Sequence, residues 1–318
     1  MRYSVIGCGR WGTFIAWYLS SIGHEVTLYG RESSWHMKRL MDSRANDYLT
    51  LPDKVNLSTR MEDAPEADAV FISVGAQQFR DLCRTLRAYG LKDRPAVLCM
   101  KGLEIGTGCR LSQVAAQELD PSVHAAVWLG PGHVQDFVRG IPNCMVIDSD
   151  DEPTKRALTE ALSGGLIRFY LGGDMIGNET GAAAKNVIGI AAGVLDGMGL
   201  SSLKGALMAR GAHEIARLIG RLGGKEISAY GLCHLGDYEA TVFSPHSHNR
   251  RFGEAFVTGT PFTGLAEGYY TAKAIVDLGR QVDMELPICE AVYASLYEHV
   301  DVRESIDALF RRTTKREF

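Results

Sequence analysis

Lys185 is the residue of this chain whose type and surroundings best suit acid–base chemistry. It follows the small-residue run Gly181-Ala182-Ala183-Ala184 and precedes Asn186. Surroundings of low polarity lower the pKa of a lysine, and such a lysine can both donate and accept a proton. We therefore predict that Lys185 transfers a proton.

Two polar segments later in the chain carry several kinds of binding group. They are Gly236-Asp237-Tyr238-Glu239-Ala240-Thr241 and Ser247-His248-Asn249-Arg250-Arg251-Phe252-Gly253. Together they supply a carboxylate, hydroxyls, an amide and cations. This mixture of groups is typical of a site that binds a small polar substrate.

A second lysine, Lys101, follows the predicted strand over 96–100 directly. Ligands of open α/β sheets bind beyond the carboxyl ends of the strands. We therefore expect Lys101 to meet a nicotinamide, a phosphate or a carbonyl oxygen.

The beginning of the chain carries a glycine fingerprint for a dinucleotide. A short apolar run leads into Gly7-Cys8-Gly9-Arg10-Trp11-Gly12, and a helical stretch follows. The first glycine permits a tight turn, and the second lets backbone N–H groups approach a pyrophosphate. The third lets the helix pack closely on the strand, so that its positive N-terminal end faces the anion.

The end of the second predicted strand indicates which dinucleotide binds. NAD sites carry an Asp or Glu about 20 residues past the glycines, where it holds the ribose 2′-OH. Here Gly30 occupies that position, and Arg31 follows it, with Ser33 and Ser34 nearby. A 2′-phosphate would meet a cation instead of a carboxylate, which favours NADP(H). NAD(H) stays open, because Glu32 lies one residue further on.

Strands and helices alternate in the first half of the chain, which predicts a doubly wound, mostly parallel sheet. The expected strands cover residues 2–6, 25–29, 69–73, 96–100, 125–129, 143–147 and 166–171, and the expected helices 12–21, 78–89 and 153–162. After about residue 175 the periodicity becomes helical, from Asn178 onward and over 202–222, 262–278 and 287–298.

This change of pattern predicts two domains. We expect an α/β Rossmann domain that binds a dinucleotide over residues 1–175, and an all-α domain for substrate and catalysis over 176–318. Apolar faces on the helices of the second domain permit a homodimer without requiring one.

The composition is that of a globular soluble protein and gives no reason to expect a nucleic-acid or membrane partner. The 318 residues are 46% hydrophobic and 23% charged, and the formal net charge is −4. The longest apolar stretch, residues 187–195, is too short for a membrane span. A predicted strand over 2–6 leaves no room for a signal peptide, and the seven cysteines lack C-x-x-C spacing. We expect a cytoplasmic protein with reduced thiols and a small-molecule substrate.

Taken in order, these segments resemble the bacterial type of NAD(P)-dependent glycerol-3-phosphate dehydrogenase over nearly the whole chain. Besides the glycine loop, the resemblance lies in Lys101-Gly102, Gly130-Pro131, Ala184-Lys185-Asn186-Val187, Arg210-Gly211 with Glu214, Gly236-Asp237 with Thr241, Asn249-Arg250-Arg251-Phe252-Gly253, Glu267-Gly268 and Met284-Glu285-Leu286-Pro287-Ile288. It implies reversible hydride transfer between a nicotinamide cofactor and dihydroxyacetone phosphate, which gives sn-glycerol 3-phosphate.

The resemblance also implies a role for each matching residue. Lys185 is the general acid in ketone reduction and the general base in alcohol oxidation, Asp237 orients it, and Lys101 binds the substrate near the nicotinamide. The other expected substrate contacts are Gly130, Asn186, Thr241, Ser247, His248, Asn249 and Arg250. The expected cofactor contacts are Gly7, Gly9, Arg10, Trp11, Gly12, Arg31, Lys101, Val134 and Glu267.

The chain departs from the family pattern at the phosphate end of the substrate. His248 stands where the family usually has an arginine, and a histidine is shorter, often neutral and unable to bind phosphate bidentately. Gly132 replaces a hydroxyl residue after Gly130-Pro131, and Arg10 replaces a small residue in the glycine loop. Either the substrate is a related polyol phosphate or hydroxyketone, or His133, His248 or Arg10 supplies the missing contacts.

Two other classes of function share some of these features. Hydroxyacid dehydrogenases and ketopantoate reductases place an Asn one helical turn after the catalytic lysine, where this chain has Gly189. A sensor that binds NADP(H) without turnover would not require both Lys185 and Asp237. Both interpretations stay open, but each is less favoured than the dehydrogenase.

A metal site is not predicted, although five candidate ligands lie close together in the sequence. They are Cys233, His234, Asp237, His246 and His248. Their spacing matches no zinc pattern, and Asp237 already has a role.

Overall fold

The computed structural model describes residues 1–314 and 316–317, and the chain divides into two compact units. Unit 1 comprises Met1–Lys101 and Cys109–Glu179, and unit 2 comprises Gly102–Gly108 and Thr180–Phe318. The short segment Gly102–Gly108, directly after Lys101, thus packs with unit 2 although it lies early in the chain.

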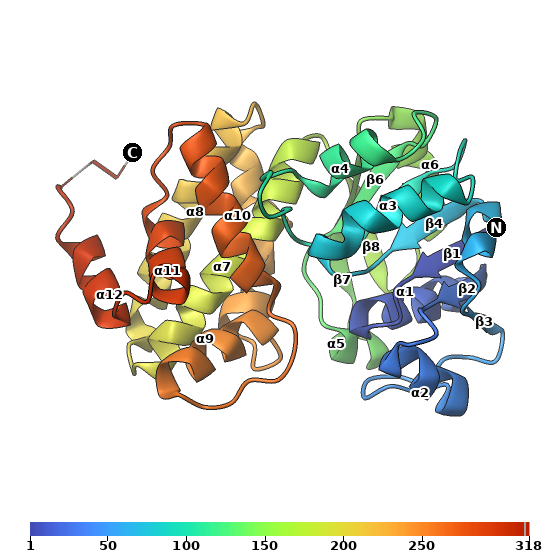
Figure 1. The fold of residues 1–318 in the computed structure, drawn as a ribbon, viewed down its shortest axis with the longest axis horizontal. Helices are drawn as coiled ribbons and strands as arrows, with labels where there is room; N and C mark the ends of the chain where they lie inside the picture. Colours follow the sequence, from blue (N-terminus) through green and yellow to red (C-terminus); the bar gives the residue numbers. More distant parts are fainter. Residues whose placement is uncertain (315, 318) are drawn as a thin grey trace. The chain divides into compact units, whose positions relative to one another are not determined.

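Unit 1 is built on one eight-stranded sheet (Figure 1) with the order β3-β2-β1-β4-β5-β6-β7-β8. The strands are β1 (Arg2–Ile6), β2 (Glu25–Tyr29), β3 (Val55–Ser58), β4 (Ala69–Ile72), β5 (Ala96–Leu98), β6 (Ala125–Leu129), β7 (Asn143–Ser149) and β8 (Ile167–Leu171). Only β6 and β7 pair antiparallel among the described strands. The prediction of a doubly wound, mostly parallel sheet is confirmed.

The order of the strands reverses at β1, which pairs with β2 on one side and β4 on the other. Such a reversal opens a crevice beyond the carboxyl ends of the two strands, where α/β proteins bind ligands. Residues 7–12 follow β1 directly, so the glycine fingerprint lies at this point of the sheet.

The helices of unit 1 follow the amphipathic pattern of the sequence. They are α1 (Arg10–Ser21), α2 (Trp35–Ser43), α3 (Phe79–Ala88), α4 (Leu111–Glu118), α5 (Val134–Val138) and α6 (Glu152–Leu162). Helix α1 buries Phe14, Ile15, Tyr18 and Leu19 in the same cluster as Tyr3 of β1. Apolar residues at this spacing form one helix face, and their burial holds α1 against the sheet.

The described residues of unit 2 form helices and no strand, as the all-α prediction requires. Its helices are α7 (Met175–Gly197, which starts in unit 1), α8 (Lys204–Arg221), α9 (His248–Thr258), α10 (Glu267–Gln281), α11 (Pro287–Tyr297) and α12 (Val302–Phe310). The short turn η3 (Ser201–Leu203) leads from α7 into α8. Between α8 and α9 lie η4 (Glu226–Tyr230), η5 (Leu235–Asp237) and the π-helical η6 (Glu239–Phe243). Figure 1 shows α7 in yellow-green among the other helices of this unit.

Glycines let α7 and α9 cross in direct backbone contact. A Cβ at Gly193 would lie 1.8 Å from the carbonyl oxygen of Arg250, and one at Gly253 would lie 2.1 Å from that of Ile190. Any side chain at either position would push the helices apart. This contact places the start of α9 close to the middle of α7, where Lys185 and Asn186 lie.

No helix in the described part of the chain combines the length and apolar character that crossing a membrane requires.

Candidate active site

The centre of the candidate site in unit 2 is the ammonium group of Lys185. This side chain is only 7% exposed, and its Nζ lies 2.8 Å from Asp237 Oδ2 and 2.7 Å from Thr241 Oγ1. Asp237 is itself 1% exposed, so the two charges form a buried pair. Removing either partner of a buried ion pair is strongly destabilising, because it leaves an uncompensated charge inside the protein.

One short segment supplies both partners of Lys185. Asp237 ends η5 and Thr241 lies in η6, so the carboxylate and the hydroxyl are four residues apart on consecutive helical turns. Residues four apart on a helical turn face the same side. The sequence therefore presents Asp237 and Thr241 together to a lysine that lies 56 residues away from Thr241.

A hydrogen bond joins two side-chain amides, those of Asn186 and Asn249, and Asn186 directly follows Lys185 on α7. Asn249 Nδ2 donates to Asn186 Oδ1 at 2.9 Å, and Asn249 Oδ1 accepts from the backbone N–H of Gly268 at 2.9 Å. The link joins α7, α9 and the start of α10, where Glu267 is the first residue. Asn186, Asn249 and Glu267, all predicted site residues, therefore lie in one neighbourhood of unit 2.

The first turn of α9 contains three further predicted residues. Ser247 caps the helix by accepting from the backbone N–H of Arg250 at 3.3 Å. The ring of His248 has Nδ1 3.2 Å from the carbonyl oxygen of Leu265. The backbone N–H groups of His248 and Asn249 precede the first backbone bond of the helix, which Arg251 makes to Ser247.

The guanidinium of Arg250 binds other groups of the protein. Its Nη1 lies 2.6 Å from Asp196 Oδ2, and its Nε donates to the carbonyl oxygen of Ser244 at 3.1 Å. Asp196 also binds Lys204 Nζ at 2.5 Å. Arg250 therefore links α9 to α7. Its contact with the substrate stays a prediction.

Unit 1 carries the glycine loop. Gly7 has φ +112°, and a Cβ there would lie 2.0 Å from the carbonyl oxygen of Ser73. A Cβ at Gly12 would lie 1.8 Å from the carbonyl oxygen of Gly7. At Gly9, by contrast, no atom of the described chain beyond its immediate neighbours comes within 4 Å of that position.

This difference between the three glycines fits a dinucleotide. Gly7 and Gly12 are required by the protein's own packing, whereas the space beside Gly9 is open. Gly9 is also the N-cap of α1 and has no side chain to cap the helix. The first backbone N–H groups of α1 are therefore left for a ligand to bind. An open space at the positive end of a helix suits a pyrophosphate.

The other predicted contacts of unit 1 follow the carboxyl ends of its strands. Lys101 Nζ donates to the carbonyl oxygen of Gly130 at 2.7 Å, so these two predicted residues are brought together. Arg31 is exposed two residues after β2, and the Arg10 guanidinium lies 5.6 Å from the ring centre of Tyr48. The side chain of Val134 is buried in the core, which leaves its backbone as the part that could meet a cofactor.

Sequence reasoning missed two buried side chains next to Asp237. The sequence offers His234 as one of five candidate metal ligands, with no metal predicted, and Tyr238 as part of a polar segment, yet the two are hydrogen-bonded at 2.7 Å. Their position beside Asp237 in the sequence was the one available signal. Across the described residues, no three His, Cys, Asp or Glu side chains are arranged to hold a metal ion.

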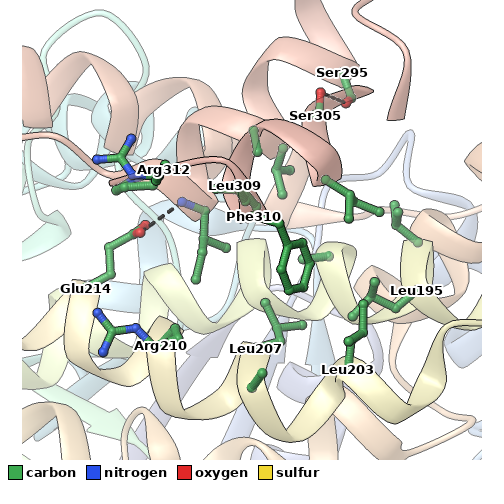
Figure 2. Close-up of a pocket in the computed structure, with 18 of the residues that line it drawn as sticks. Leu195, Leu203, Leu207, Arg210, Glu214, Ser295, Ser305, Leu309, Phe310 and Arg312 are labelled. Carbon is green, nitrogen blue, oxygen red and sulfur yellow. Dashed lines mark hydrogen bonds between the residues drawn. The ribbon is translucent and has the colours of Figure 1, made fainter. Parts of the chain in front are cut away.

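A cavity of about 570 Å³ in unit 2 has a different lining (Figure 2). Its wall is mostly apolar and includes Leu195, Leu207 and Phe310, with Arg210 and Glu214 at one edge. The Glu214 carboxylate accepts from the backbone N–H groups of Ile288 and Cys289 at 2.9 and 3.0 Å, and so caps α11. None of the predicted catalytic, cofactor or substrate residues lines this cavity, so it is not the predicted substrate site.

Comparison with known proteins agrees with this geometry. The family model described as the N-terminus of NAD-dependent glycerol-3-phosphate dehydrogenase matches residues 2–155, and the model of its C-terminus matches residues 174–307. A relative from Chlorobium phaeobacteroides, named glycerol-3-phosphate dehydrogenase [NAD(P)+], is 34% identical over 332 residues and covers 100% of this chain and 99% of its own length. A relative of the same name from Bradyrhizobium sp. is 36% identical over 320 residues, covering 99% and 97%.

A solved structure of glycerol-3-phosphate dehydrogenase from Coxiella burnetii superposes with a TM-score of 0.91 at 28% identity, covering 98% of this chain and 99% of that one. The resemblance predicted from the motifs is therefore confirmed in both halves of the chain. With these matches and the buried Lys185–Asp237 pair, this chain belongs to the NAD-dependent glycerol-3-phosphate dehydrogenase family.

Proposed function

We propose that this protein catalyses the reversible reduction of dihydroxyacetone phosphate to sn-glycerol 3-phosphate with a nicotinamide dinucleotide. The observation that carries the proposal is the Lys185 ammonium, held between Asp237 and Thr241 in a chain that matches the family throughout. The names of the full-length relatives support the same activity.

The chemistry assigned to Lys185 is proton transfer at the reacting oxygen. When bound, the cofactor supplies the hydride that turns the carbonyl carbon into an alcohol carbon. As that bond forms, the carbonyl oxygen gains negative charge, and the Lys185 ammonium stabilises the charge and gives up a proton. In alcohol oxidation the neutral amine takes the proton back. The carboxylate of Asp237 holds the ammonium in place, and no metal is needed.

The cofactor assignment rests on unit 1. The glycine loop, Arg10 and Trp11 are proposed to hold the pyrophosphate at the N-terminus of α1, with the backbone of Val134 nearby. We assign NADP(H) as the preferred cofactor, because the exposed Arg31 follows β2 where an NAD site would have a carboxylate. Glu267 is assigned to the nicotinamide ribose.

The phosphate of the substrate is assigned to the first turn of α9. Backbone N–H groups of His248 and Asn249 lie at this helix N-terminus, and the Ser247 hydroxyl lies beside them. Arg250 adds positive charge, although its guanidinium is shared with Asp196. Lys101, Gly130, Asn186 and Thr241 are proposed to position the rest of the substrate.

The remaining proposals concern the domains, the cellular location, the partners and the oligomeric state. We propose a dinucleotide-binding domain over residues 1–175 and a catalytic domain over 176–318, in a cytoplasmic protein that acts on a small molecule and not on nucleic acid. A homodimer is also proposed, through the apolar helices of the second domain. Sedimentation of the purified protein would test the dimer.

The test of the function is oxidation of NADPH and NADH with dihydroxyacetone phosphate. Unphosphorylated dihydroxyacetone and a short panel of hydroxyketone phosphates serve as comparison substrates. A high kcat/KM confined to dihydroxyacetone phosphate supports the proposal and shows that His248 does not prevent phosphate binding. A better rate on another panel member means that His248 and Gly132 mark a changed substrate. Cofactor binding without turnover on any ketone would indicate a sensor.

A further inference from the structure

We infer that His234, together with Tyr238, is a positioning residue for the Lys185–Asp237 pair. The imidazole ties the helix that carries Lys185 to the segment that carries both of its partners. The inference deepens the proposed function and rests on it, because it assigns a positioning task to a side chain that is fully buried behind the catalytic pair.

The contacts of His234 reach both sides of the pair. Its side chain is fully buried, with Nδ1 2.8 Å from the carbonyl oxygen of Gly181 and Nε2 2.7 Å from Tyr238 Oη. Gly181 lies on α7 four residues before Lys185, about one helical turn, so the bond is made on the helix face that also carries the lysine. A Cβ at Gly181 would come within 2.9 Å of His234 Cβ, so this close approach requires the glycine.

The backbone carries the same connection to Asp237 and Thr241. The N–H of Asp237 donates to the carbonyl oxygen of His234 at 3.0 Å, and the N–H of Thr241 donates to that of Tyr238 at 3.1 Å. Each partner of Lys185 is therefore bonded to one member of the His234–Tyr238 pair. A shift of the imidazole would move the carboxylate and the hydroxyl relative to α7, and displacements of about 1 Å suffice to slow catalysis.

The hydrogen bonds determine the tautomer of His234. A carbonyl oxygen can only accept, so Nδ1 carries the proton that it donates to Gly181. Nε2 then accepts from the Tyr238 hydroxyl, and both ring nitrogens are satisfied. Burial lowers the pKa of His234 to about 4, with the nearby Lys185 ammonium acting in the same direction. The imidazole is therefore neutral near pH 7 and does not compete with Lys185 for the Asp237 charge.

Several other titratable groups face this cluster. Lys185 of α7 and Asp237 of η5 act on His234, while Glu214 of α8 and Cys289 of α11 act on Tyr238. Burial raises the pKa of Glu214 to about 7, so Glu214 can titrate in the range of an activity assay. The wild type and the variants compared below all keep Glu214. Its titration therefore cancels in the difference between their pH profiles.

The test compares His234→Asn with His234→Leu. The asparagine amide can donate to the Gly181 carbonyl as Nδ1 does, whereas leucine fills similar space without a donor. For reduction of dihydroxyacetone phosphate, we expect His234→Leu to lower kcat on the order of 10-fold or more, with the cofactor KM unchanged. The alkaline limb of the pH profile of kcat should move to lower pH in His234→Leu. An ammonium that Asp237 holds less closely loses its proton more readily. His234→Asn keeps the donor to Gly181 but loses the bond to Tyr238, so its loss of kcat and its shift should both be clearly smaller than those of His234→Leu.

A purely structural role predicts a different result. His234→Leu would then melt at a lower temperature but keep the wild-type kcat and alkaline limb, and this outcome overturns the inference. Equal losses in His234→Asn and His234→Leu also overturn it, since the donor to Gly181 would be irrelevant. If His234→Leu does not fold, Tyr238→Phe replaces it, with a smaller shift of the limb expected because Nδ1 can still donate.

A second readout separates this inference from the proposed function. The titration of the Lys185 amine can be followed by NMR of lysine-labelled protein without substrate or cofactor. A lower Lys185 pKa in His234→Leu than in wild type supports the positioning role even if dihydroxyacetone phosphate is not reduced. An unchanged Lys185 pKa contradicts it even if the enzyme is fully active.

Discussion

The glycine loop of unit 1 and the lysine centre of unit 2 are built on opposite principles. The loop consists of backbone groups within residues 7–12, and two of its three glycines are demanded by contacts with the adjoining strands and loop. The lysine centre consists of side chains that come from α7, η5, η6 and α9. A local backbone site can be recognised in a short motif, whereas a side-chain site exists only when distant elements pack together.

The largest expected effect is on the lysine centre. Lys185→Ala should lower kcat by about 10²–10⁴, the range typical of a lost general acid, while cofactor affinity stays close to wild type. Stopped-flow or steady-state NADPH oxidation and a separate binding titration measure the two quantities. Lys273→Ala, which removes a half-buried lysine of α10 that lies outside the proposed site, is the matched control and should keep its activity. A Lys185→Ala variant with full activity would show that another group transfers the proton.

The second prediction separates the two kinds of glycine in the loop. Gly12→Ala should lower the melting temperature by several degrees, because its Cβ would lie 1.8 Å from the Gly7 carbonyl oxygen. Gly9→Ala should melt near wild type, since its φ of −75° suits alanine and the space beside it is open, yet it should weaken cofactor binding by about 10-fold or more. Differential scanning calorimetry and a fluorescence titration with NADPH distinguish the two variants. If Gly9→Ala binds cofactor normally, the open space is not the pyrophosphate site.

The third prediction concerns a buried side chain of unit 2 that takes no part in the proposed reaction. Burial raises the pKa of Glu214 to about 7, whereas an unfolded glutamate titrates near 4.3. The folded state therefore holds the proton more tightly, and its stability falls as pH rises between about 4.5 and 7, by up to about 1.4 kcal/mol per pH unit. Urea unfolding at pH 5 and pH 7 should show this slope in the wild type and lose it in Glu214→Gln. Glu290→Gln, on α11, should keep most of the slope, because burial is the largest cause of the raised pKa of Glu214 and the Glu290 charge is the smallest of those named.

The smallest expected effect tests the choice of cofactor. Arg31→Ala should raise the KM for NADPH by about 10-fold and leave that for NADH nearly unchanged, because only NADPH has a 2′-phosphate for the guanidinium to bind. Glu32→Gln is the complementary variant and should affect NADH alone if this carboxylate reaches the ribose. Equal changes for the two cofactors in Arg31→Ala would remove the argument for NADP(H).

The regular elements of the fold were largely predictable from the sequence. The strands β1, β2 and β6 begin and end where the apolar runs predicted, and α1, α3 and α6 agree within two residues. These segments have strong apolar periodicity, which is a local property. Strand β3 was missed because it has four residues, of which only Val55 is buried.

Helix α9 was missed for a different reason. Its first residues are polar and resemble a binding segment, and Gly253 is its one buried residue. It packs on α7 through glycine rather than through a stripe of large apolar side chains. A helix held in this way leaves little trace in the hydrophobic pattern.

The sequence by itself determined the alternation of strands and helices, the glycine loop and the lysine in its small-residue helix. Each depends on residues within one or two turns of one another, so their types and spacing suffice. The pairing of Asp237 with Lys185 was already implied by the family resemblance. Only the packed structure revealed that Thr241 also contacts Lys185, that Asn249 bonds Asn186 across 63 residues, and that Arg250 binds Asp196. It also brought the ring of His234 into hydrogen-bond contact with the carbonyl oxygen of Gly181. Such pairings depend on how whole helices pack, and the sequence spacing between two partners carries no information about that packing.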